Sequence, residues 1–531
     1  MNTLGMTTSV CNTCRRLVPA KVVVEGSKVS FDKFCPDHGR HRAYIYSDVE
    51  QYLHAQRFVK PAVTPLAFAG DAKKPCTEGC GMCSNHEQHL CMPIVEITNR
   101  CDLACPVCLV ASGAGVSPAS VDEIVQRHGI GLSSSDASLN GTHTAGETPA
   151  PLDGDMSVDD FRRVLGRLIA AERQVDILTL SGGEPLLHPR ILDIVDAAAA
   201  RPEIVRVSIS TNGLALLRDP ALLPALAERN VVISLQFDGL DDTAYTTLRG
   251  RPLRDEKLRL LDLLATSAVT TSLTVTLAAG VNEGQLAPIL DYFFAQRHVV
   301  SLMIQPVAYA GRAADLAGRG DRLTIPDVIR LLAATRKVEA ADFAPLPCSH
   351  PLCFSLAYYL MLDWGGRVPV NRLIQADGLM DALSNRTVFG LDENEHQRIK
   401  DMVYDLWSGP AGTAPDGQAV LETLRNILGE LSCDCFNAKK AFTTAERRIK
   451  SIFIHAFQDA DTFDQARVRR CCNAYPQPDG RLIPACVHNV LGGRSERGAG
   501  VPPASDGPCG TFCPQAGPCE GETPAPRGGR T

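Results

Sequence analysis

Six strand-like segments alternate with helix-like segments between residues 92 and 307. The run 175–185 has the continuous apolar character of a buried strand, whereas 157–174 has the spacing of an amphipathic helix. Such alternation predicts a parallel sheet whose strands are joined by right-handed helical crossovers. We therefore expect an α/β core over residues 92–315, interrupted by a Gly-, Ser- and Thr-rich insertion at 110–155.

The composition narrows the possible classes of function. The chain has 531 residues, enough for about two to four domains, and a net charge of −7 without a large basic block. This charge balance disfavours nucleic-acid binding through the phosphates. No apolar stretch is long enough for a spanning helix, and the first residues lack the pattern of a signal peptide. We therefore expect a cytoplasmic protein whose 20 cysteines are metal ligands or redox groups rather than disulfides.

Three cysteines follow the first strand of the core. Cys101, Cys105 and Cys108 have C-x3-C-x2-C spacing, which is one ligand short of the four that a 4Fe–4S cluster normally takes from a protein. A zinc loop has similar spacing and remains an alternative. In parallel α/β folds the chemistry lies at the carboxyl ends of the strands. The later strands end in SGGEP, STNG and QFDG, so these sequences are candidates for the same site.

A second group of metal-binding residues lies in the N-terminal unit, residues 1–60. The runs 20–26 and 28–34 flank a turn and predict two strands, with too few apolar residues for an independent core. A metal is the expected staple, held at tetrahedral spacing by Cys11, Cys14, Cys35 and His38. The site is either a zinc ribbon or, if a thiolate replaces the histidine, a rubredoxin-like iron site.

A third group falls in residues 61–95 and predicts an auxiliary 4Fe–4S cluster without an open iron. Its expected ligands are Cys76, Cys80, Cys83 and Cys91. Zinc, with His86 or His89 among its ligands, is the competing interpretation. Otherwise we expect these two histidines around the cluster or at the surface.

Residues 316–490 are expected to form a mainly helical C-terminal domain that bears further cysteines. A second auxiliary cluster would gather its ligands from distant segments, namely Cys348, Cys353, one of Cys471 and Cys472, and Cys486. Buried free cysteines are the alternative. Cys433 and Cys435 are read as partial ligands or spares. The Gly- and Pro-rich tail 491–531 is expected to be disordered, with Cys509, Cys513 and Cys519 lacking a function.

The three-cysteine motif, followed by GGEP and six β/α units, resembles the radical S-adenosylmethionine (SAM) superfamily. The resemblance implies a partial (β/α)6 barrel in which Cys101, Cys105 and Cys108 bind three irons, while the amino and carboxylate groups of SAM chelate the fourth. It also implies that the GGEP backbone and Glu184 hold the methionyl ammonium, and that a later strand end contacts the ribose and carboxylate. The implied cofactor-binding residues are Gly182, Gly183, Glu184, Pro185, Ser210, Thr211 and Asn212, with Gln236 and Asp238 as weaker candidates.

The cysteine run from 76 to 108, with CPDHG before it and PCSHPLC and GRLIPACVHNVL after it, is more specific. It resembles the radical SAM proteins identified as class D methyltransferases, or dihydro-hydroxymethylpterin methyltransferases, and the related tetraether lipid synthases. The resemblance implies C–C bond formation at an unactivated carbon, on a pterin or related small molecule. Coupling or cyclisation of lipid chains is the first alternative.

A non-catalytic iron–sulfur sensor or electron carrier is an alternative of a different class. Retention of GGEP, STNG and all six β/α units argues against it. For the enzyme, the expected partners are a small-molecule or lipid substrate and an electron donor such as flavodoxin or ferredoxin. We expect no transmembrane segment, and a lipid substrate could enter a groove from a membrane surface without one.

Overall fold

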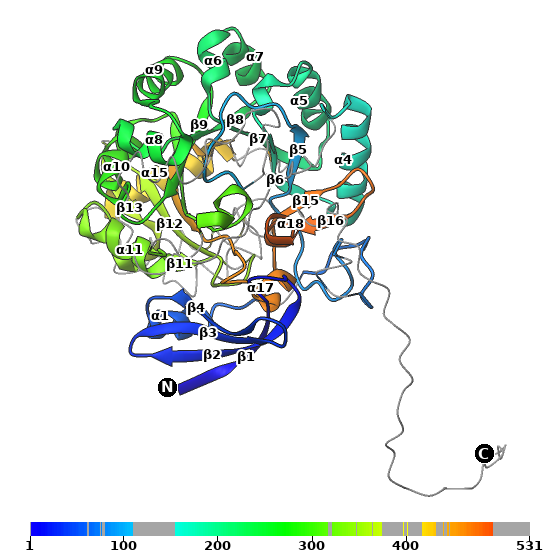
Figure 1. Cartoon of the computed structure of the whole chain (residues 1–531). Helices are drawn as coiled ribbons and strands as arrows, with labels where there is room; N and C mark the ends of the chain where they lie inside the picture. The colour runs from blue at the N-terminus through cyan, green and yellow to red at the C-terminus, as the bar shows by residue number, and fades with distance from the viewer. Residues whose placement is uncertain are drawn as a thin grey trace, which may run out of the picture.

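The computed structural model describes residues 2–109 and 154–491 with short gaps. The gaps are 61–62, 75, 77–79, 317–320, 347, 364, 374–396, 398–400, 402–416, 432–438, 440–442 and 445. Figure 1 shows a small N-terminal sheet beside a larger body in which helices surround the strands. The insertion predicted at 110–155 and the tail predicted at 491–531 lie almost wholly outside the described residues.

The N-terminal unit is a four-stranded antiparallel sheet, hereafter the ribbon. Its strands, in the order in which they pair, are β1 (Asn2–Val10), β2 (Leu17–Glu25), β3 (Lys28–Cys35) and β4 (Gly39–Tyr46), and helix α1 (Val49–Ala55) follows. The two predicted strands are β2 and β3. Val29 and Phe31 of β3 join Tyr52 of α1 in the apolar cluster that also forms the core of the larger body. The ribbon therefore lacks a separate core, as its short sequence predicts.

The larger body contains the six predicted parallel strands in chain order. They are β5 (Ile94–Thr98), β6 (Val175–Gly182), β7 (Ile204–Thr211), β8 (Val231–Gln236), β9 (Thr270–Leu277) and β10 (Val299–Pro306). Each strand pairs in parallel with the next. The predicted partial (β/α)6 barrel is thus confirmed in its strand order and direction.

Helices cover the outer face of this sheet (Figure 1). They are α4 (Val158–Glu172), α5 (Ile191–Ala199), α6 (Leu214–Arg218), α7 (Leu222–Glu228), α8 (Asp242–Arg249), α9 (Arg254–Ala265) and α10 (Leu286–Ala295), with 3-10 turns η1 (Pro185–Leu187) and η2 (Glu283–Gln285). Side chains start two of them. Ser157 Oγ accepts from the Asp160 N–H at 3.1 Å, and Asp241 accepts from the Ala244 N–H at 3.1 Å. These caps satisfy N–H groups that have no partner within the helix.

Alternation along the strands gives the sheet two different faces. Leu178 and Leu180 of β6 and Leu273 and Val275 of β9 are fully buried in the apolar cluster under the helices. The residues between them face the opposite, inner side of the barrel and are mostly half-buried Ser and Thr. Successive side chains of a strand point to opposite faces, so the sequence pattern itself separates an apolar outer face from a polar inner face.

Residues 216–230 have the apolar spacing of a single helix, but the structure has two helices in this region, α6 and α7. Pro220 lies between them and has no N–H to donate. Asp219, the residue before it, has φ −133° and ψ 80°, which is outside the helical region, as expected before proline. The segment before α9 forms the separate helix α8, which is followed by the cap residue Gly250 with φ 83°.

The C-terminal region differs most from its prediction, because it adds strands to the barrel sheet as well as helices. Strand β14 (Ile449–His455) pairs in parallel with β10, and β12 (Phe354–Met361) pairs antiparallel with β14. The other elements are η3 (Gly311–Leu316), α11 (Ile325–Ala334), η4 (Ala340–Asp342), β11 (Ala344–Pro345), β13 (Arg367–Pro369), α12 (Val370–Leu373), α15 (Gly417–Leu431), α17 (Gln465–Arg469), β15 (Ala474–Pro476), β16 (Leu482–Pro484) and α18 (Ala485–Leu491). Its described residues therefore continue the core sheet and do not fold apart from it.

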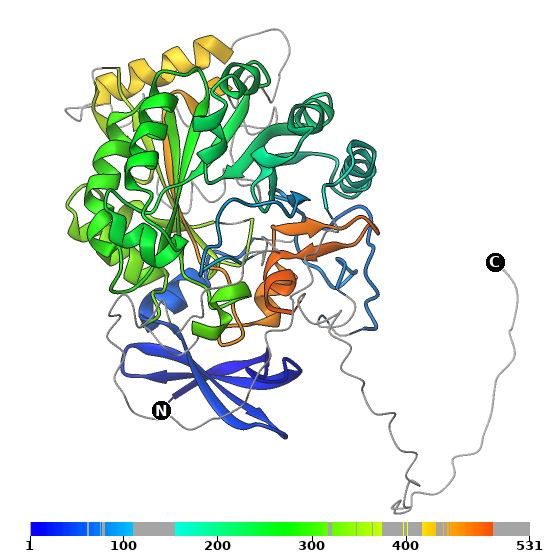
Figure 2. The same ribbon diagram turned by 45° about the horizontal axis from the view of Figure 1, so that its top comes forward.

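Strands β15 and β16 form a hairpin that lies beside β5 (Figure 2). The hairpin and α18 thus bring the last described residues close to the first strand of the barrel. Among the described helices, none combines the length and the apolar character needed to cross a bilayer.

Gly183 is expected to be intolerant of any side chain. A Cβ there would lie 2.1 Å from the Arg100 carbonyl oxygen, whereas a Cβ at the exposed helical Gly166 would meet nothing within 4 Å. We expect Gly183→Ala to destabilise the chain by about 1–3 kcal/mol through overpacking. The matched Gly166→Ala should stabilise it by about 0.5–1 kcal/mol through helix propensity. Denaturant unfolding of the two variants checks this, and equal midpoints would contradict it.

Candidate functional site

The three-cysteine loop begins directly after β5 and is held by the end of β6. The Gly183 N–H donates to the Thr98 carbonyl at 2.7 Å, and the Glu184 N–H donates to the Arg100 carbonyl at 2.6 Å. Cys108 is anchored from the other side, because its carbonyl accepts from the Arg312 N–H at 3.0 Å. The predicted cluster motif therefore lies at the carboxyl ends of the strands, where the α/β pattern placed it.

The two glycines of GGEP make room for this loop. A Cβ on Gly182, whose φ is +121°, would lie 2.3 Å from the Thr98 carbonyl oxygen, and Gly183 is packed as tightly on Arg100. Backbone therefore approaches backbone here, and glycine is required on steric grounds. The expected close approach is present, but its partner in this structure is the β5 loop.

Glu184 is fully occupied by donors of the chain. Its carboxylate accepts from Thr211 Oγ1 at 2.6 Å, from the Asn212 N–H at 2.7 Å and from the Leu186 N–H at 3.1 Å. The side chain is 1% exposed, and burial raises the pKa of Glu184 to about 7. These contacts join the end of β6 to the end of β7. Its predicted contact with the methionyl ammonium stays a prediction, as does the cofactor role of the neighbouring Pro185.

Asn212 connects β7 to the cysteine loop. Its Nδ2 donates to Asp102 Oδ1 at 2.7 Å, and the other Asp102 oxygen accepts from Arg218 at 2.7 Å. Ser210 lies two residues earlier, half-buried on the inner face and paired in register with Ser234 of β8. The structure thus places Ser210 and Asn212 at the end of β7 that faces the cysteine loop, where Asn212 contacts Asp102. The contacts of Ser210 and Asn212 with SAM remain predictions.

The weaker candidates Gln236 and Asp238 belong to a buried charged network. Asp238 accepts from Arg249 at 2.6 and 2.9 Å, and Arg249 also donates to Thr276 Oγ1 at 2.8 Å. Gln236 contacts Asp238 and accepts from Lys257 Nζ at 2.8 Å. The Gln236 carboxamide and the Asp238 carboxylate are therefore both hydrogen-bonded within the protein.

Two basic residues of this network were not predicted from the sequence. Arg249 is buried beside Cys105 and Asp238, and despite burial the Asp238 carboxylate, with the Cys105 sulfur, raises its pKa. Lys257 is 0% exposed, donates to the Asn212 and Gln236 carbonyls at 2.7 Å each, and has a pKa lowered to about 7 by burial. A cation next to the cysteine loop offsets the negative charge that thiolates bring to a cluster. In the sequence, both basic residues lie on ordinary-looking amphipathic helices.

The N-terminal residues come together as predicted. Cys11, Cys14, Cys35 and His38 place their ligand atoms within 4.8 Å of one another. His38 Nδ1 lies 3.6 Å from the Cys11 sulfur and 3.5 Å from the Cys35 sulfur, and the Cys14 and Cys35 sulfurs are 3.8 Å apart. A tetrahedral ion with bonds of about 2.3 Å separates its ligands by about 3.8 Å, so the site fits a single metal ion. The histidine is the fourth donor, which matches a three-thiolate, one-imidazole site.

The remaining cysteines are grouped differently from the prediction. Cys91, expected with Cys76, Cys80 and Cys83, instead lies with two C-terminal cysteines. Its sulfur is 3.4 Å from the Cys348 sulfur, which is 3.7 Å from that of Cys472. All three are at most 1% exposed. This grouping follows from the fold. Cys91 lies just before β5, and in the folded chain it lies next to the segment after β11, which carries Cys348, and the segment after α17, which carries Cys472.

A second C-terminal set contains Cys353, Cys471 and Cys486. Backbone hydrogen bonds join the segments that carry them, because the Ala456 N–H donates to the Cys353 carbonyl at 2.9 Å and the Ala485 N–H donates to the Asn473 carbonyl at 3.0 Å. Burial raises the pKa of Cys486 to about 11. The predicted single site with Cys348 is therefore split into two sets. Cys76, Cys80 and Cys83 form a third neighbourhood, in which burial raises the pKa of Cys80 to about 12. Buried thiols with raised pKa values stay protonated unless a metal deprotonates them.

The two histidines near these cysteines are buried rather than exposed. His86 Nε2 lies 2.9 Å from the Cys471 carbonyl, and His89 Nδ1 lies 3.6 Å from Glu172. Neither belongs to a group of possible metal ligands among the described residues. The predictions for Cys433, Cys435, Cys509, Cys513 and Cys519 lie outside the described residues.

The residues present fit the groups that the motif implies. Cys101, Cys105 and Cys108 are partly exposed, and burial raises the pKa of Cys101 to about 12. They do not meet the close spacing of a single-ion site, unlike the ribbon residues. Three thiols spread more widely suit a multi-iron cluster better than one zinc ion.

The observed cysteine sets predict which substitutions act together. Cys91→Ser and Cys472→Ser should remove the same metal centre, whereas Cys353→Ser should remove a different one. Iron counting and paramagnetic resonance of each reconstituted variant check this. The outcome that contradicts the grouping is loss of one signal in both Cys353→Ser and Cys472→Ser, with Cys91→Ser losing another.

Comparison with known proteins gives two family matches. The radical SAM superfamily matches residues 95–293, and the HMPTM N-terminal zinc ribbon domain matches residues 3–47. The 7,8-dihydro-6-hydroxymethylpterin dimethyltransferase of Methanocaldococcus jannaschii is 25% identical over 517 residues, covering 91% of this chain and 93% of that protein. GTP 3′,8-cyclase of Chlorobaculum tepidum is 35% identical over 116 residues, 22% of this chain and 34% of that protein.

A solved structure of Streptococcus suis SuiB bound to precursor peptide SuiA aligns with a TM-score of 0.34 and 14% identity, covering 48% of this chain and 46% of that chain.

The radical SAM match spans five of the six strands of the barrel from β5 onward, and the zinc-ribbon match contains the predicted metal site. Similarity to the pterin dimethyltransferase extends over nearly the full length of both chains. The chain therefore has a radical SAM domain and an HMPTM-type zinc ribbon, and over nearly its full length it is similar to an enzyme of the methyltransferase type.

Proposed function

We propose that the chain forms a C–C bond on a polar small molecule of the pterin type, in a methyltransferase-like reaction. The name of its relative, a dihydro-hydroxymethylpterin dimethyltransferase, supports a substrate of this class. The observation that carries the proposal is the polar inner face of the barrel. Hydroxyl groups on successive strands suit a heterocycle with several donors and acceptors better than an alkyl chain.

The inner face carries hydroxyl groups on four neighbouring strands. Half-buried examples are Ser181, Ser210, Ser234, Ser272, Thr274 and Thr276. Register places Ser234 beside both Ser210 and Ser272, and its hydroxyl lies 3.0 Å from Thr274 Oγ1. Burying such groups against an apolar chain would cost free energy, because their hydrogen bonds with water would be lost.

One aromatic pair lies near the C-terminal thiols. Phe354 and His455 stack with ring centroids 3.7 Å apart, and Phe354, which is only 2% exposed, packs with Cys91, Cys348 and Cys472. The cysteine loop has a small apolar cluster of its own, in which Tyr245 and three leucines pack against Cys101 and Cys105. Lipid coupling at a membrane surface is therefore kept as the alternative that the hydroxyl-rich inner face supports less.

When bound, the cluster and SAM supply a 5′-deoxyadenosyl radical that removes hydrogen from an unactivated carbon. The chain's own residues position these groups. Gly182 and Gly183 fix the cysteine loop, Glu184 fixes the Asn212 backbone, and Lys257 holds the ends of β7 and β8 together. Precise placement by such contacts is the contribution that the protein makes to cofactor chemistry.

The other metal sites follow from the same proposal. Zinc suits the ribbon because three thiolates and one imidazole are a common structural set for that ion. Auxiliary iron–sulfur clusters are proposed at the two C-terminal cysteine sets and at Cys76, Cys80 and Cys83. Flavodoxin or ferredoxin is the proposed class of electron donor, and the cytoplasm the proposed location.

Product analysis tests the proposal directly. Given dithionite as the reductant and a folate-type one-carbon donor, the anaerobically reconstituted chain should convert SAM to methionine and 5′-deoxyadenosine. It should also transfer a one-carbon unit from that donor to reduced hydroxymethylpterin, detected by mass spectrometry. Cys105→Ala, which removes a cluster ligand, is the inactive control. Product formation from phospholipid but not from pterin would reject the pterin assignment in favour of the lipid alternative.

A further inference from the structure

The ribbon is joined to the segment 456–473, which carries Cys471 and Cys472. Helix α17 lies within this segment and packs against β1 (Figure 1). Thr7 Oγ1 of β1 donates to Asp464 Oδ1 at 2.6 Å, and the same Asp464 oxygen caps α17 through the Ala466 N–H at 2.9 Å. Val10 packs with Ala460 and Phe463 in one apolar cluster. The ribbon therefore supports the helix that leads into the two cysteines.

Lys33 of β3 joins the two parts from within. It is 2% exposed, and its ammonium donates to the Ala460 carbonyl at 2.8 Å and the Asp461 carbonyl at 2.9 Å. The same group donates to Asn12 Oδ1 at 2.9 Å and to the Val10 carbonyl at 3.2 Å. Two acceptors thus come from the ribbon and two from the segment. A buried ammonium needs partners for its three N–H donors, so loss of either pair of acceptors would leave at least one donor without a partner.

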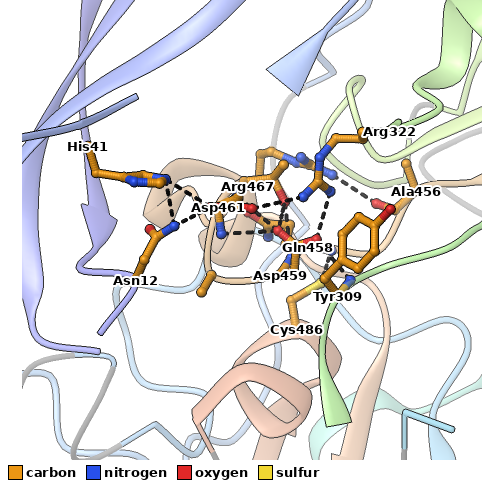
Figure 3. A network of polar contacts seen from close by, with 12 residues as sticks. Asn12, His41, Tyr309, Arg322, Ala456, Gln458, Asp459, Asp461, Arg467 and Cys486 are labelled. Atoms are coloured by element: carbon orange, nitrogen blue, oxygen red, sulfur yellow. Dashed lines mark hydrogen bonds and ion pairs between the residues drawn. The ribbon is translucent and has the colours of Figure 1, made fainter. Parts of the chain in front are cut away.

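Asn12 lies inside the metal-binding loop, between the ligands Cys11 and Cys14. Its Nδ2 contacts Asp461 Oδ1 and lies 2.7 Å from His41 Nε2 (Figure 3). His41 lies 3.1 Å from the same Asp461 oxygen. A metal bound by the two flanking cysteines would fix the loop, and with it the position of the Asn12 carboxamide.

Beyond Asp461 the network continues to the barrel. Arg322 binds Asp461 Oδ2 at 3.2 Å and Asp459 Oδ2 at 2.6 Å, and the Tyr309 N–H donates to Asp459 Oδ2 at 2.9 Å (Figure 3). Asp459 Oδ1 accepts from the N–H groups of Asp461 and Thr462 at 3.1 Å each. The turn at 459–462 is therefore held between the ribbon on one side and the loop after β10 on the other.

The other end of the segment reaches the thiols of the second C-terminal set. The Gln458 N–H donates to the Cys486 sulfur at 3.3 Å, and Arg467 Nε donates to the Cys353 sulfur at 3.3 Å. Arg467 also donates to the Ala456 carbonyl at 2.9 Å. Cys471, the third thiol, lies in the segment itself. Segment 456–473, which the ribbon holds, therefore contains Cys471 and hydrogen-bonds to the sulfurs of Cys353 and Cys486.

We propose that the ribbon positions segment 456–473, so that metal binding at Cys11, Cys14, Cys35 and His38 favours iron binding at Cys353, Cys471 and Cys486. Asn12, Lys33 and Asp461 are the positioning residues that transmit this coupling. By thermodynamic linkage, filling either site raises the affinity of the other. Segment 456–473 has two states. It is ordered when a bound metal holds the ribbon loop in place, and it opens locally when the metal is absent and the loop can move.

The inference rests on the metal sites proposed above, and the test distinguishes a failure of those sites from a failure of the coupling between them. The full-length chain is reconstituted anaerobically with zinc, iron and sulfide, as wild type and as Asp461→Ala, Cys14→Ser and Cys353→Ser. Asp461→Ala removes the carboxylate that Asn12, His41 and Arg322 share. Glu25→Ala, which removes an exposed ribbon carboxylate, is the matched control.

The measurements are iron per chain, amide hydrogen exchange of 456–473, and the spectrum of the reduced SAM cluster. We expect Asp461→Ala and Cys14→Ser to lose as much iron as Cys353→Ser, with exchange in the segment about tenfold faster or more. The SAM-cluster spectrum and the Glu25→Ala variant should match wild type. Retention of wild-type iron and exchange in both variants would overturn the coupling.

Two further outcomes have defined meanings. Wild-type iron content in Cys353→Ser would reject the proposed iron site itself, and the coupling with it. If Asp461→Ala does not fold, Thr7→Val replaces it, because it deletes only the hydrogen bond to Asp464. That variant should show the same faster exchange in 456–473, and unchanged exchange there would count against the proposal.

Discussion

The site depends on a backbone contact between the ends of two neighbouring strands. Gly182 and Gly183 lie so close to Thr98 and Arg100 that no Cβ fits, and two backbone hydrogen bonds of 2.7 and 2.6 Å close the contact. This contact sets where the chain leaves β5 and therefore where Cys101 lies. Glu184, directly after Gly183, accepts from the N–H of Asn212, the residue that follows β7, and the Asn212 side chain donates to Asp102 beside the first cysteine. The cluster motif is thus held by three strand ends rather than by its own loop.

Much of the barrel was predictable because local pattern and fold agree. Strands β5 to β10 have apolar outer positions that recur every second residue, and helices α4 and α8 have side-chain caps and amphipathic spacing. The four metal ligands of the ribbon were predictable because the short spacing within each pair, Cys11 with Cys14 and Cys35 with His38, limits how far apart their donor atoms can lie. Pro220 could have signalled the break between α6 and α7, since the residue before a proline rarely stays helical.

The remaining features depend on contacts between segments that are distant in sequence. Spacing alone grouped Cys91 with Cys76, Cys80 and Cys83, but the sheet places it beside Cys348, which is 257 residues away. The addition of β12 and β14 to the barrel sheet has the same origin, because strand pairing is decided by the whole fold. Arg249 and Lys257 look like ordinary helix residues until burial reveals the carboxylates and carbonyls that they bind.

The central claim is that Cys101, Cys105 and Cys108 hold a cluster with one iron left open for SAM. Paramagnetic resonance of the reduced, reconstituted chain tests it most directly, in a variant lacking Cys80, Cys353 and Cys472, which removes the signals of all three proposed auxiliary clusters. Adding SAM should shift the spectrum, because an amino and a carboxylate group would enter the coordination of the open iron. Cys101→Ala in the same background should abolish the signal. An unchanged spectrum with SAM present in excess would contradict the account.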